Sequence, residues 1–296
     1  MTSLCYAITG ANGQIGSFLV DFLRKRRNTV YELVRAEDKA KEKKYYQHFD
    51  LAKPLEMPSL KHIDILIHTA HFFDTTDKNY KKTNVLGTQK LFQQARADGV
   101  KYNIFISSIS AHAAAFSLYG KVKYELEQLL IEEKSQWVII RPGLIFHTPL
   151  QGITAAIEHY VMKYPIVPLI GGGTQPIYPC LLTELAQLIE TVSIKQPRIK
   201  KPIVAASENS VTFKELIKFL AKQNGKRILF LTIPFYAVYS LLRIMEFLNL
   251  PVGLRSDSLL GLQFVNKEMD FSETQNLGFS FNQILNLREI QRWDIC

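Results

Sequence analysis

The first half of the chain alternates between two patterns of apolar residues. Short segments that are apolar almost throughout are typical of strands buried on both faces, and longer segments with apolar residues every three or four positions are typical of helices. Strands that alternate with helices indicate an α/β fold, a doubly wound parallel sheet with right-handed crossovers. The patterns predict strands over residues 4–8, 29–34, 63–69, 102–107 and 137–141, and helices over residues 15–23, 85–97 and 119–132.

The pattern changes after Pro142, where glycines and prolines become frequent and a run of three glycines marks a loop. Residues 183–193 and 212–223 have the spacing of amphipathic helices. Thr212 and Glu215, at the start of the second of these helices, form the sequence signature of a capping box.

This change of pattern predicts two parts of unequal size. Residues 1–165 are expected to form a dinucleotide-binding Rossmann domain, to which later segments, at about residues 183–206, return. Residues 166–296 are expected to form mainly a smaller, mostly C-terminal substrate lobe.

Bulk composition is typical of a globular, water-soluble protein with a large core. The chain has 296 residues, of which 47% are hydrophobic, and a formal net charge of +9. Some of the positive charge lies in two runs, at residues 24–27 and 39–44. A nucleic-acid patch and a solvated helix end with a basic loop both explain these runs. We favour the second interpretation and expect no nucleic-acid partner.

Cysteine usage and hydropathy bear on the compartment. Cys5, Cys180 and Cys296 are scattered, without metal or disulfide spacing, so we expect no metal and a reducing compartment, the cytoplasm. No signal peptide is recognisable at the N-terminus. The longest uncharged stretch, residues 228–242, is too short to span a bilayer and contains Pro234, so no integral membrane segment is expected. We interpret it as core or as a wall of the substrate lobe, with contact to a membrane surface as the less favoured alternative.

A glycine-rich turn connects the first predicted strand to the first predicted helix. Gly10 allows the tight exit from the strand, Gly13 lets the backbone approach a pyrophosphate, and Gly16 lets the helix pack on the sheet. The N-terminus of the helix directs N–H groups and the positive end of its dipole toward a phosphate. An ordinary strand–helix turn is the alternative, but the place of the glycines between a strand and a helix favours dinucleotide binding.

Tyr119 and Lys123 lie four positions apart, on one face of a predicted helix. An ammonium group beside a phenol lowers the pKa of the phenol, which would prepare Tyr119 to exchange a proton with an alcohol or sugar oxygen. Ser108, at the end of the preceding strand, is placed to hydrogen-bond the same oxygen, while a nicotinamide exchanges hydride with the carbon. An amphipathic helix edge would also explain Tyr119 and Lys123, and a turn at the end of a strand would explain Ser108. The order along the chain, with the glycine turn first, then a buried strand, Ser108 and the Tyr119–Lys123 pair, favours catalysis.

These motifs resemble the extended short-chain dehydrogenases/reductases of the NAD(P)-dependent epimerase/dehydratase type, over nearly the whole chain. Residues 9–16 match the family's Thr-Gly-x-x-Gly-x-x-Gly, and residues 50–51 resemble its Asp-Leu near adenine. Residues 64–71 resemble its Asp-x-Val-x-His-x-Ala segment, and residues 84–88 match its Asn-Val-x-Gly-Thr helix start. Further matches are Ser107-Ser108, Tyr119 with Lys123, Arg141-Pro142-Gly143, Arg255-Ser256-Asp257, and Asp270 through Leu277-Gly278-Phe279.

The resemblance implies roles for the matching residues and a homodimer through a four-helix contact that includes the Tyr119 helix. Ser108 would polarise the substrate oxygen, Tyr119 would be the acid/base, and Lys123 would also hold the nicotinamide ribose. Arg255 would bind a diphosphate of the substrate, or remain a surface cation. The implied cofactor-binding residues are Gly10, Asn12, Gly13, Gln14, Ile15, Gly16, Arg35, Asp50, Leu51, Thr69, Ala70, His71, Tyr119, Lys123, Pro142, Gly143 and Ile145. The implied substrate-binding residues are His71, Asn84, Ser108, Ser110 and Arg255.

The end of the second predicted strand bears on the choice of cofactor. An NAD-preferring site usually places a carboxylate there, whereas this chain has Leu33-Val34-Arg35. Arg35 is suited to pair with a 2′-phosphate, so NADP(H) is favoured over NAD(H). Stacking on adenine and exposure to water are the alternatives for Arg35.

Two departures from the family pattern limit the substrate. Ile109 and Ser110 follow Ser108 where dehydratases carry Asp-Glu, so the pair that performs elimination is missing. The phosphate-binding arginine that many uridine-diphosphate-sugar enzymes carry near Ile177 is also missing. We predict oxidoreduction or epimerisation at a carbinol or carbonyl carbon of a nucleotide sugar, for polysaccharide biosynthesis. A reductase of a hydrophobic alcohol or ketone, suggested by the apolar residues 230–242, and a non-catalytic nucleotide-binding relative are the alternatives.

Overall fold

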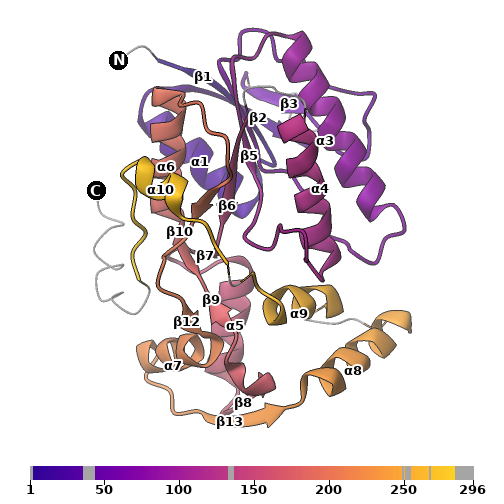
Figure 1. Ribbon diagram of the computed structural model, residues 1–296, viewed down its shortest axis with the longest axis vertical. Helices are drawn as coiled ribbons and strands as arrows, with labels where there is room; N and C mark the ends of the chain where they lie inside the picture. The colour runs from indigo at the N-terminus through magenta and orange to yellow at the C-terminus, as the bar shows by residue number, and fades with distance from the viewer. Residues whose placement is uncertain are drawn as a thin grey trace.

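The computed structural model of the chain describes residues 3–35, 44–132, 137–248, 250, 255–266 and 268–283. Seven parallel strands form its central sheet in the order β11-β6-β5-β4-β1-β2-β3 (Figure 1). The strand order reverses at β1, which makes the space between the ends of β1 and β4 the switch point where doubly wound sheets bind ligands. The strands are β1 (Cys5–Thr9), β2 (Thr29–Val34), β3 (Tyr46–His48), β4 (Ile65–His68), β5 (Tyr102–Ile106), β6 (Trp137–Pro142) and β11 (Ile203–Ala205).

Helices cover both faces of this sheet (Figure 1). Helices α1 (Gln14–Lys25) and α6 (Leu182–Lys195) share one core with the sheet, and α3 (Tyr80–Ala97) and α4 (Leu118–Glu132) share the other. Successive strand residues point to opposite faces, so Ile8 lies in the first core and Ala7 in the second. The predicted α/β class and doubly wound parallel sheet are confirmed.

Some sheet elements differ from the sequence predictions. Strands β3 and β11 were not predicted, because three residues are too few to show a periodic pattern. Helix α3 begins at Tyr80 rather than at residue 85, since the residues before Val85 are mostly polar and hide the first turn.

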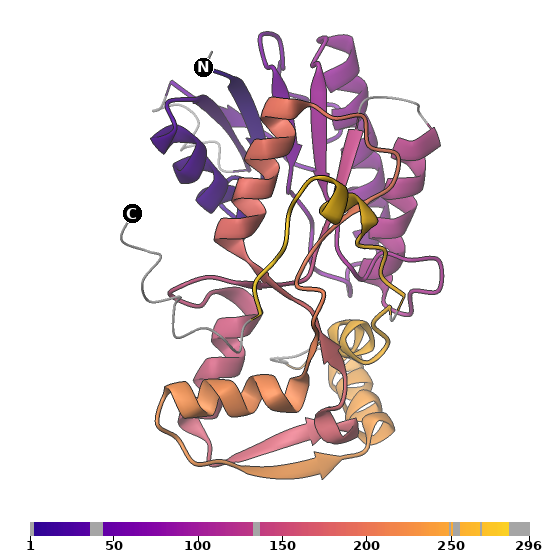
Figure 2. The ribbon, with the colours of Figure 1, turned by 60° about the vertical axis from the view of Figure 1, so that its left-hand side comes forward.

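Most of the remaining elements lie at the other end of the molecule, and β7 and β10 lie between that end and the central sheet (Figures 1 and 2). Two small apolar cores form among them, one around Leu216 and Phe146 and the other around Ile217 and Val167, while Cys180 on β10 belongs to the first core of the central sheet. The predicted capping box is present at the start of α7, where Glu215 N donates to Thr212 Oγ1 over 3.1 Å. The elements are β7 (Leu144–Phe146), α5 (Gly152–Lys163), β8 (Ile166–Ile170), a 3-10 turn (Gly171–Gly173), β9 (Pro176–Ile177), β10 (Pro179–Leu181), β12 (Val211–Thr212), α7 (Phe213–Gln223), β13 (Leu229–Ile233), α8 (Phe235–Phe247) and α9 (Ser256–Gln263).

Late segments of the chain return to the central sheet. Strand β11 pairs with β6, and α6 packs beside α1. Helix α10 (Ser272–Asn276) lies against β11, where Thr274 Oγ1 donates to the Val204 carbonyl over 2.6 Å, and Phe281 reaches the first core. The division into two domains at about residue 165 stays a prediction.

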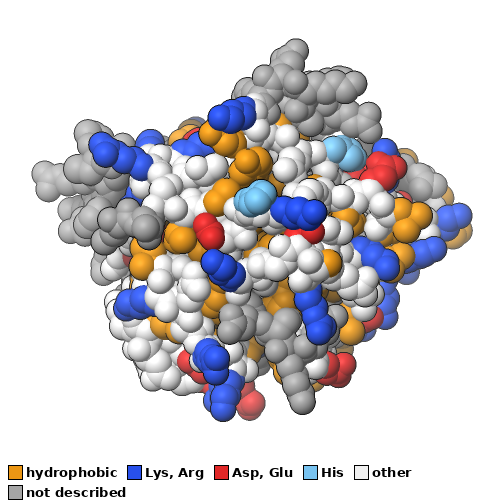
Figure 3. Space-filling view, turned by 90° about the horizontal axis from the view of Figure 1, so that it is seen from above, with side chains coloured by type: hydrophobic (Ala, Val, Ile, Leu, Met, Phe, Trp, Pro, Cys, Tyr) orange, Lys and Arg blue, Asp and Glu red, His pale blue; other side chains and the backbone are white. Residues whose placement is uncertain are grey.

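Two arginines of the first basic run, residues 24–27, form ion pairs with carboxylates of the same chain. Arg24 forms an ion pair with Glu32 at 2.6 Å, and Arg26 forms one with Glu190 at 2.7 Å. Figure 3 shows Lys and Arg side chains spread over the face seen from above rather than gathered in a single patch. Of the second run, residues 39–43 lie outside the described residues, as does Cys296. Within the described ranges, no helix has both the length and the apolar character to cross a membrane.

Candidate functional site

The turn after β1 is shaped by its glycines. Gly10 has φ of +66°, and a Cβ there would lie 2.9 Å from the Ala70 backbone. Gly13 N donates to the Gly10 carbonyl over 2.8 Å, and a Cβ on Gly16 would overlap that carbonyl. Gly13 is the N-cap of α1, and no side chain caps the first N–H groups of the helix. These N–H groups and the positive end of the α1 dipole face the carboxyl edge of the sheet. This geometry suits a phosphate.

Thr9 joins the carboxyl ends of β1 and β4. Its Oγ1 accepts hydrogen bonds from Thr69 N and Ala70 N, both over 3.2 Å, and lies 2.6 Å from His68 Nδ1. Because both lone pairs of the hydroxyl are used, its proton is donated to Nδ1, and His68 Nε2–H donates to Thr88 Oγ1 over 3.0 Å. Burial, helped by the nearby Lys123 charge, lowers the pKa of His68 well below its usual value, which keeps the ring neutral.

Tyr119 stands at the start of α4, half-buried among aromatic rings. The ring meets His71 edge-on at 5.0 Å between centroids and is stacked on Phe73 at 6.2 Å. Burial raises the pKa of Tyr119 to about 12, although a hydrogen bond to Ser108 acts in the opposite direction. The sequence predicted a lowered pKa, so that expectation is wrong for this structure, and Tyr119 is a protonated phenol at neutral pH.

Lys123 lies one helical turn behind Tyr119 and is almost completely buried, with 2% of its surface exposed. Its Nζ donates to the Ile106 carbonyl over 2.8 Å and lies 4.7 Å from the centroid of the Phe105 ring. Burial lowers the pKa of Lys123 to about 7, while the charge of Glu127 raises it. Lys123 is therefore a buried amine whose charge changes near neutral pH, anchored to the end of β5.

A buried ion pair that the sequence analysis missed lies behind Lys123. Glu127, fully buried, accepts hydrogen bonds from Arg141 Nε over 2.9 Å and from Ser107 Oγ over 2.5 Å. Burial raises the pKa of Glu127, and the contacts with Arg141 and Ser107 oppose that shift. The available signal was spacing, because Tyr119, Lys123 and Glu127 follow one another every four residues on one face of α4.

The segment after β4 is held against α3. His71 Nε2 and Tyr80 Oη lie 2.8 Å apart, and burial lowers the pKa of His71 well below its usual value. The amide of Asn84 accepts from Phe72 N and donates to the carbonyls of Phe72 and Tyr80. Asn84, predicted to contact substrate, is buried and serves this segment in the structure.

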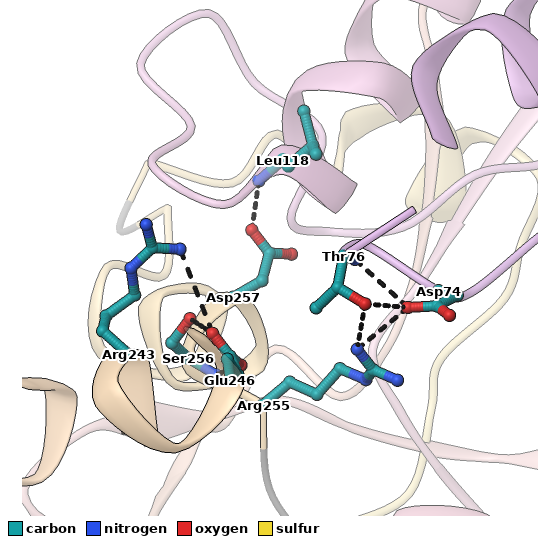
Figure 4. Close-up of polar contacts among 8 residues, drawn as sticks. All are labelled: Asp74, Thr76, Leu118, Arg243, Glu246, Arg255, Ser256 and Asp257. Carbon is teal, nitrogen blue, oxygen red and sulfur yellow. Dashed lines mark hydrogen bonds and ion pairs between the residues drawn. The ribbon is translucent and has the colours of Figure 1, made fainter. Parts of the chain in front are cut away.

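Arg255 connects the C-terminal elements to the same segment (Figure 4). Its guanidinium lies 2.9 Å from Asp74 Oδ1 and donates to Thr76 Oγ1 over 3.0 Å. Hydrogen bonds from Thr76, together with Arg255, lower the pKa of Asp74. In this structure Arg255 is thus neither a free surface cation nor turned away from the site.

Asp257 binds the start of α4, the helix that carries Tyr119 and Lys123. Its carboxylate accepts hydrogen bonds from Leu118 N over 2.5 Å and from Tyr119 N over 3.2 Å, from a position 139 residues away from Leu118 (Figure 4). Glu246 accepts from both the N–H and the hydroxyl of Ser256, which fixes α9 against α8. Asp257 therefore supplies the N-terminal cap of α4 from another part of the chain.

Other predicted cofactor residues lie at the same edge of the sheet. Asn12 is exposed in the glycine loop, and Arg35 is exposed directly after β2. Gln14 Nε2 is buried without a hydrogen-bond partner. Asp50 accepts from Ala52 N over 2.9 Å, and Leu51 is buried beneath Gly87.

The remaining predicted residues follow β5 and β6 or begin α1. Ser110 N donates to Ser108 Oγ over 3.1 Å, and Pro142 ends β6. A Cβ on Gly143 would overlap the Tyr178 carbonyl, so glycine is required there. Ile145 lies on β7, and Ile15 is half-buried on α1. The described part of the chain contains no group of three His, Cys, Asp or Glu side chains that could hold a metal ion.

Comparison with known proteins gives the family. Residues 10–162, just over half of the chain, match the family described as NAD(P)H-binding. The chain therefore belongs to this family, and the predicted resemblance to the extended short-chain dehydrogenases/reductases of the epimerase/dehydratase type is confirmed. A nicotinamide dinucleotide is accordingly its class of cofactor.

Individual relatives are more distant. The UDP-glucose 4-epimerase of Vibrio cholerae is 26% identical over 245 residues, which cover 72% of this chain and 74% of that protein. The mitochondrial NADH dehydrogenase (ubiquinone) 1 alpha subcomplex subunit 9 of Arabidopsis thaliana is 23% identical over 201 residues, 64% of this chain and 50% of that protein. The structure of MoeE5 in complex with UDP-glucuronic acid and NAD is similar in fold, with a TM-score of 0.70 and 18% sequence identity. The match covers 98% of this chain and 99% of that chain.

Gly10 and Gly99 form a matched pair for testing the glycine turn. Both have positive φ, +66° and +75°, but a Cβ on Gly99 meets nothing within 4 Å. Gly99→Ala should cost about 1 kcal/mol of unfolding free energy from backbone strain alone. Gly10→Ala should cost roughly 2 kcal/mol more, because its Cβ would meet Ala70 and Thr69. Urea unfolding measures both, and equal costs would show that the contact with Ala70 is unimportant.

Lys123 should make stability depend on pH. Its pKa of about 7 in the folded chain lies below the ordinary 10.5, so the unfolded chain binds more protons between these values. The free energy of unfolding of the wild type, relative to Lys123→Met, should therefore rise with pH above neutrality, by up to about 1.4 kcal/mol per pH unit. Urea unfolding at several pH values from about 7 to 9.5 covers this window. The exposed Lys121→Met is the matched control, and a pH-independent difference for Lys123→Met would contradict the assignment.

Asp257 should stabilise α4 and position Tyr119. Asp257→Ala removes the carboxylate acceptors of Leu118 N and Tyr119 N but leaves the bond from Gly120 N to Ser117 Oγ, and should lower the free energy of unfolding by about 1 kcal/mol. Asp257→Asn keeps an amide oxygen and should recover part of that loss. Asp21→Ala, an exposed aspartate on α1, is the control. If Asp257→Ala unfolds at the same urea concentration as the wild type, the cap contributes nothing.

Proposed function

We propose that the chain is an NAD(P)-dependent epimerase or reductase that acts at a carbinol or carbonyl carbon of a nucleotide sugar. One observation carries the proposal. The Tyr119 side chain lies close enough to Ser108, just after β5, for that hydroxyl to lower the pKa of the phenol, beside the switch point where the glycine turn lies. A proton donor and a dinucleotide turn on neighbouring strand ends are the two components that hydride transfer to a carbonyl requires.

The residues at this edge fit a nicotinamide dinucleotide. A Cβ on Gly10 would meet the Ala70 backbone and a Cβ on Gly13 or Gly16 would meet the Gly10 carbonyl, so the turn keeps its close shape only with glycine, and Gln14 Nε2 is a buried donor without a partner. Arg35 is exposed at the end of β2, where it would pair with a 2′-phosphate, so we propose NADP(H) over NAD(H). The bound cofactor supplies the hydride chemistry, and the protein supplies the binding, the orientation and the proton.

Tyr119 is the proposed acid/base. Because burial raises its pKa to about 12, the phenol carries its proton at neutral pH and is ready to donate it to a carbonyl oxygen that becomes an alcohol. Ser108 would hold the same oxygen. In the reverse direction the phenol must release its proton first, and the buried Lys123 behind it would stabilise the phenolate when charged.

The substrate is proposed to carry a diphosphate that Arg255 binds. Arg255 lies at the rim of the site on Asp74 and Thr76, so diphosphate binding would replace one anionic partner by another. The missing Asp-Glu after Ser108 argues against dehydration. Polysaccharide biosynthesis, a cytoplasmic location and a homodimer belong to the same proposal.

A non-catalytic nucleotide-binding role is the second candidate, and one observation favours it. The Arabidopsis relative is named as a subunit of a larger enzyme. The alternative of a hydrophobic substrate has less support. The apolar residues 230–242 lie on β13 and α8, and no residue of α8 is buried, so these side chains do not enclose a binding pocket.

Tyr119→Phe separates catalysis from nucleotide binding. The variant keeps the ring contacts with His71 and Phe73 but lacks the phenol hydroxyl and the proton that it would donate. Turnover of UDP-glucose or UDP-galactose should fall by about 10²- to 10⁴-fold, while the Kd values for NADPH and NADH remain those of the wild type. The same titrations compare the two cofactors, and tighter binding of NADPH is expected from Arg35.

Tyr124→Phe, on the same helix, is the matched control and should leave turnover unchanged. Analysis of the nucleotide that co-purifies with the wild type distinguishes the reactions, since a retained oxidised cofactor indicates epimerisation and a freely exchanging one indicates net redox. Retention of full turnover by Tyr119→Phe would refute the acid/base role. Cofactor binding without turnover in the wild type would support the second candidate.

A further inference from the structure

Helix α8 presents apolar side chains to solvent. None of its thirteen residues is buried, although it is apolar around its whole circumference. Tyr236, Ile244 and Phe247 are 77%, 56% and 85% exposed. A helix that is apolar on all sides is normally buried, so the outer face of α8 is suited to contact something beyond this chain.

The two-stranded sheet before α8 has the same character. Leu229 on β13 pairs with Ile166 on β8, and both side chains lie on the exposed face together with Leu231. The other face, with Val167 and Leu169, packs into the small core under α7. Strand β13 leads through Pro234 directly into α8 at the end of the molecule opposite the central sheet (Figures 1 and 2). These six residues, Ile166, Leu229, Leu231, Tyr236, Ile244 and Phe247, are the apolar end.

The stretch of chain that carries β13 and most of α8 is rich in positive charge. Residues 216–245 contain five basic residues and no acidic residue. Lys226 and Arg227 are exposed immediately before β13, and Lys163 is exposed immediately before β8. Glu246, the next acidic residue, is turned inward to Ser256 and has 8% of its side chain exposed.

We propose that the apolar end docks this protein on the surface of a bilayer that contains anionic lipids. Exposed aromatic and aliphatic side chains flanked by Lys and Arg are what such an interface attracts. A second copy of the chain is the poorer partner, because a twofold contact would bring Lys226 and Arg227 close to the same cations of the other copy. This docking does not depend on the proposed reaction.

Sedimentation of the full-length protein with vesicles tests the proposal. The wild type should partition onto phosphatidylcholine vesicles that contain phosphatidylglycerol at least about tenfold more strongly than onto phosphatidylcholine alone, and added salt should weaken this binding. Lys226→Glu with Arg227→Glu should remove the preference for phosphatidylglycerol. Tyr236→Ser with Phe247→Ser should lower binding to both kinds of vesicle.

Matched controls change the same residue types elsewhere. Leu55→Ser replaces an exposed leucine, 92% exposed, and Lys101→Glu reverses an exposed charge, and both should bind like the wild type. All substituted side chains are exposed, and urea unfolding confirms that each variant is folded. Equal binding to both vesicle types, or unchanged binding of the apolar-end variants, would overturn the proposal. So would a vesicle-free dimer that Phe247→Ser dissociates, because a second copy would then cover this face.

Discussion

The hydrogen bonds of Thr9 are the contact on which the rest of the candidate site depends. They tie the end of β1 to the end of β4 at the point where the strand order reverses, and His68 extends the connection to Thr88 on α3. The side chains of Thr9, His68 and Thr88 are buried, so breaking a bond between them would leave an unpaired polar atom in the core. The glycine turn begins at the next residue, and the segment that carries His71 and Phe73 begins just beyond Thr69. The Thr9 hydroxyl therefore positions both the glycine turn after β1 and the segment after β4.

The parts of the site that are local in sequence could be predicted from it. The glycine turn follows a strand and opens a helix within eight residues, and Tyr119 with Lys123 needs only the helical repeat. Asp257 could not be assigned to the start of α4, because 139 residues separate it from Leu118 and only the folded chain brings them together. The same holds for the partners of Arg255.

Burial explains where the chemical expectation for Tyr119 failed. Sequence spacing places an ammonium near the phenol, but it does not say how much water surrounds either group. In the structure burial dominates both, raising the pKa of Tyr119 and lowering that of Lys123. The buried Glu127, paired with the partly buried Arg141, fixes the face of α4 from which these side chains project. The predicted residues are thus in place, while their proton affinities are set by packing.

Arg255 and Asp257 stand two positions apart, yet Arg255 binds Asp74 in the segment after β4 while Asp257 binds the first turn of α4 (Figure 4). A molecule that displaces Asp74 from the Arg255 guanidinium would also move the backbone of residues 255–257. This backbone carries Asp257, which binds the first turn of α4. Thermodynamic reciprocity then applies: whatever tightens that first turn changes the affinity for the molecule by the same factor. Under the proposed function, binding at Arg255 and alignment of the phenol would in this way be coupled through the two peptide units that join Arg255 to Asp257.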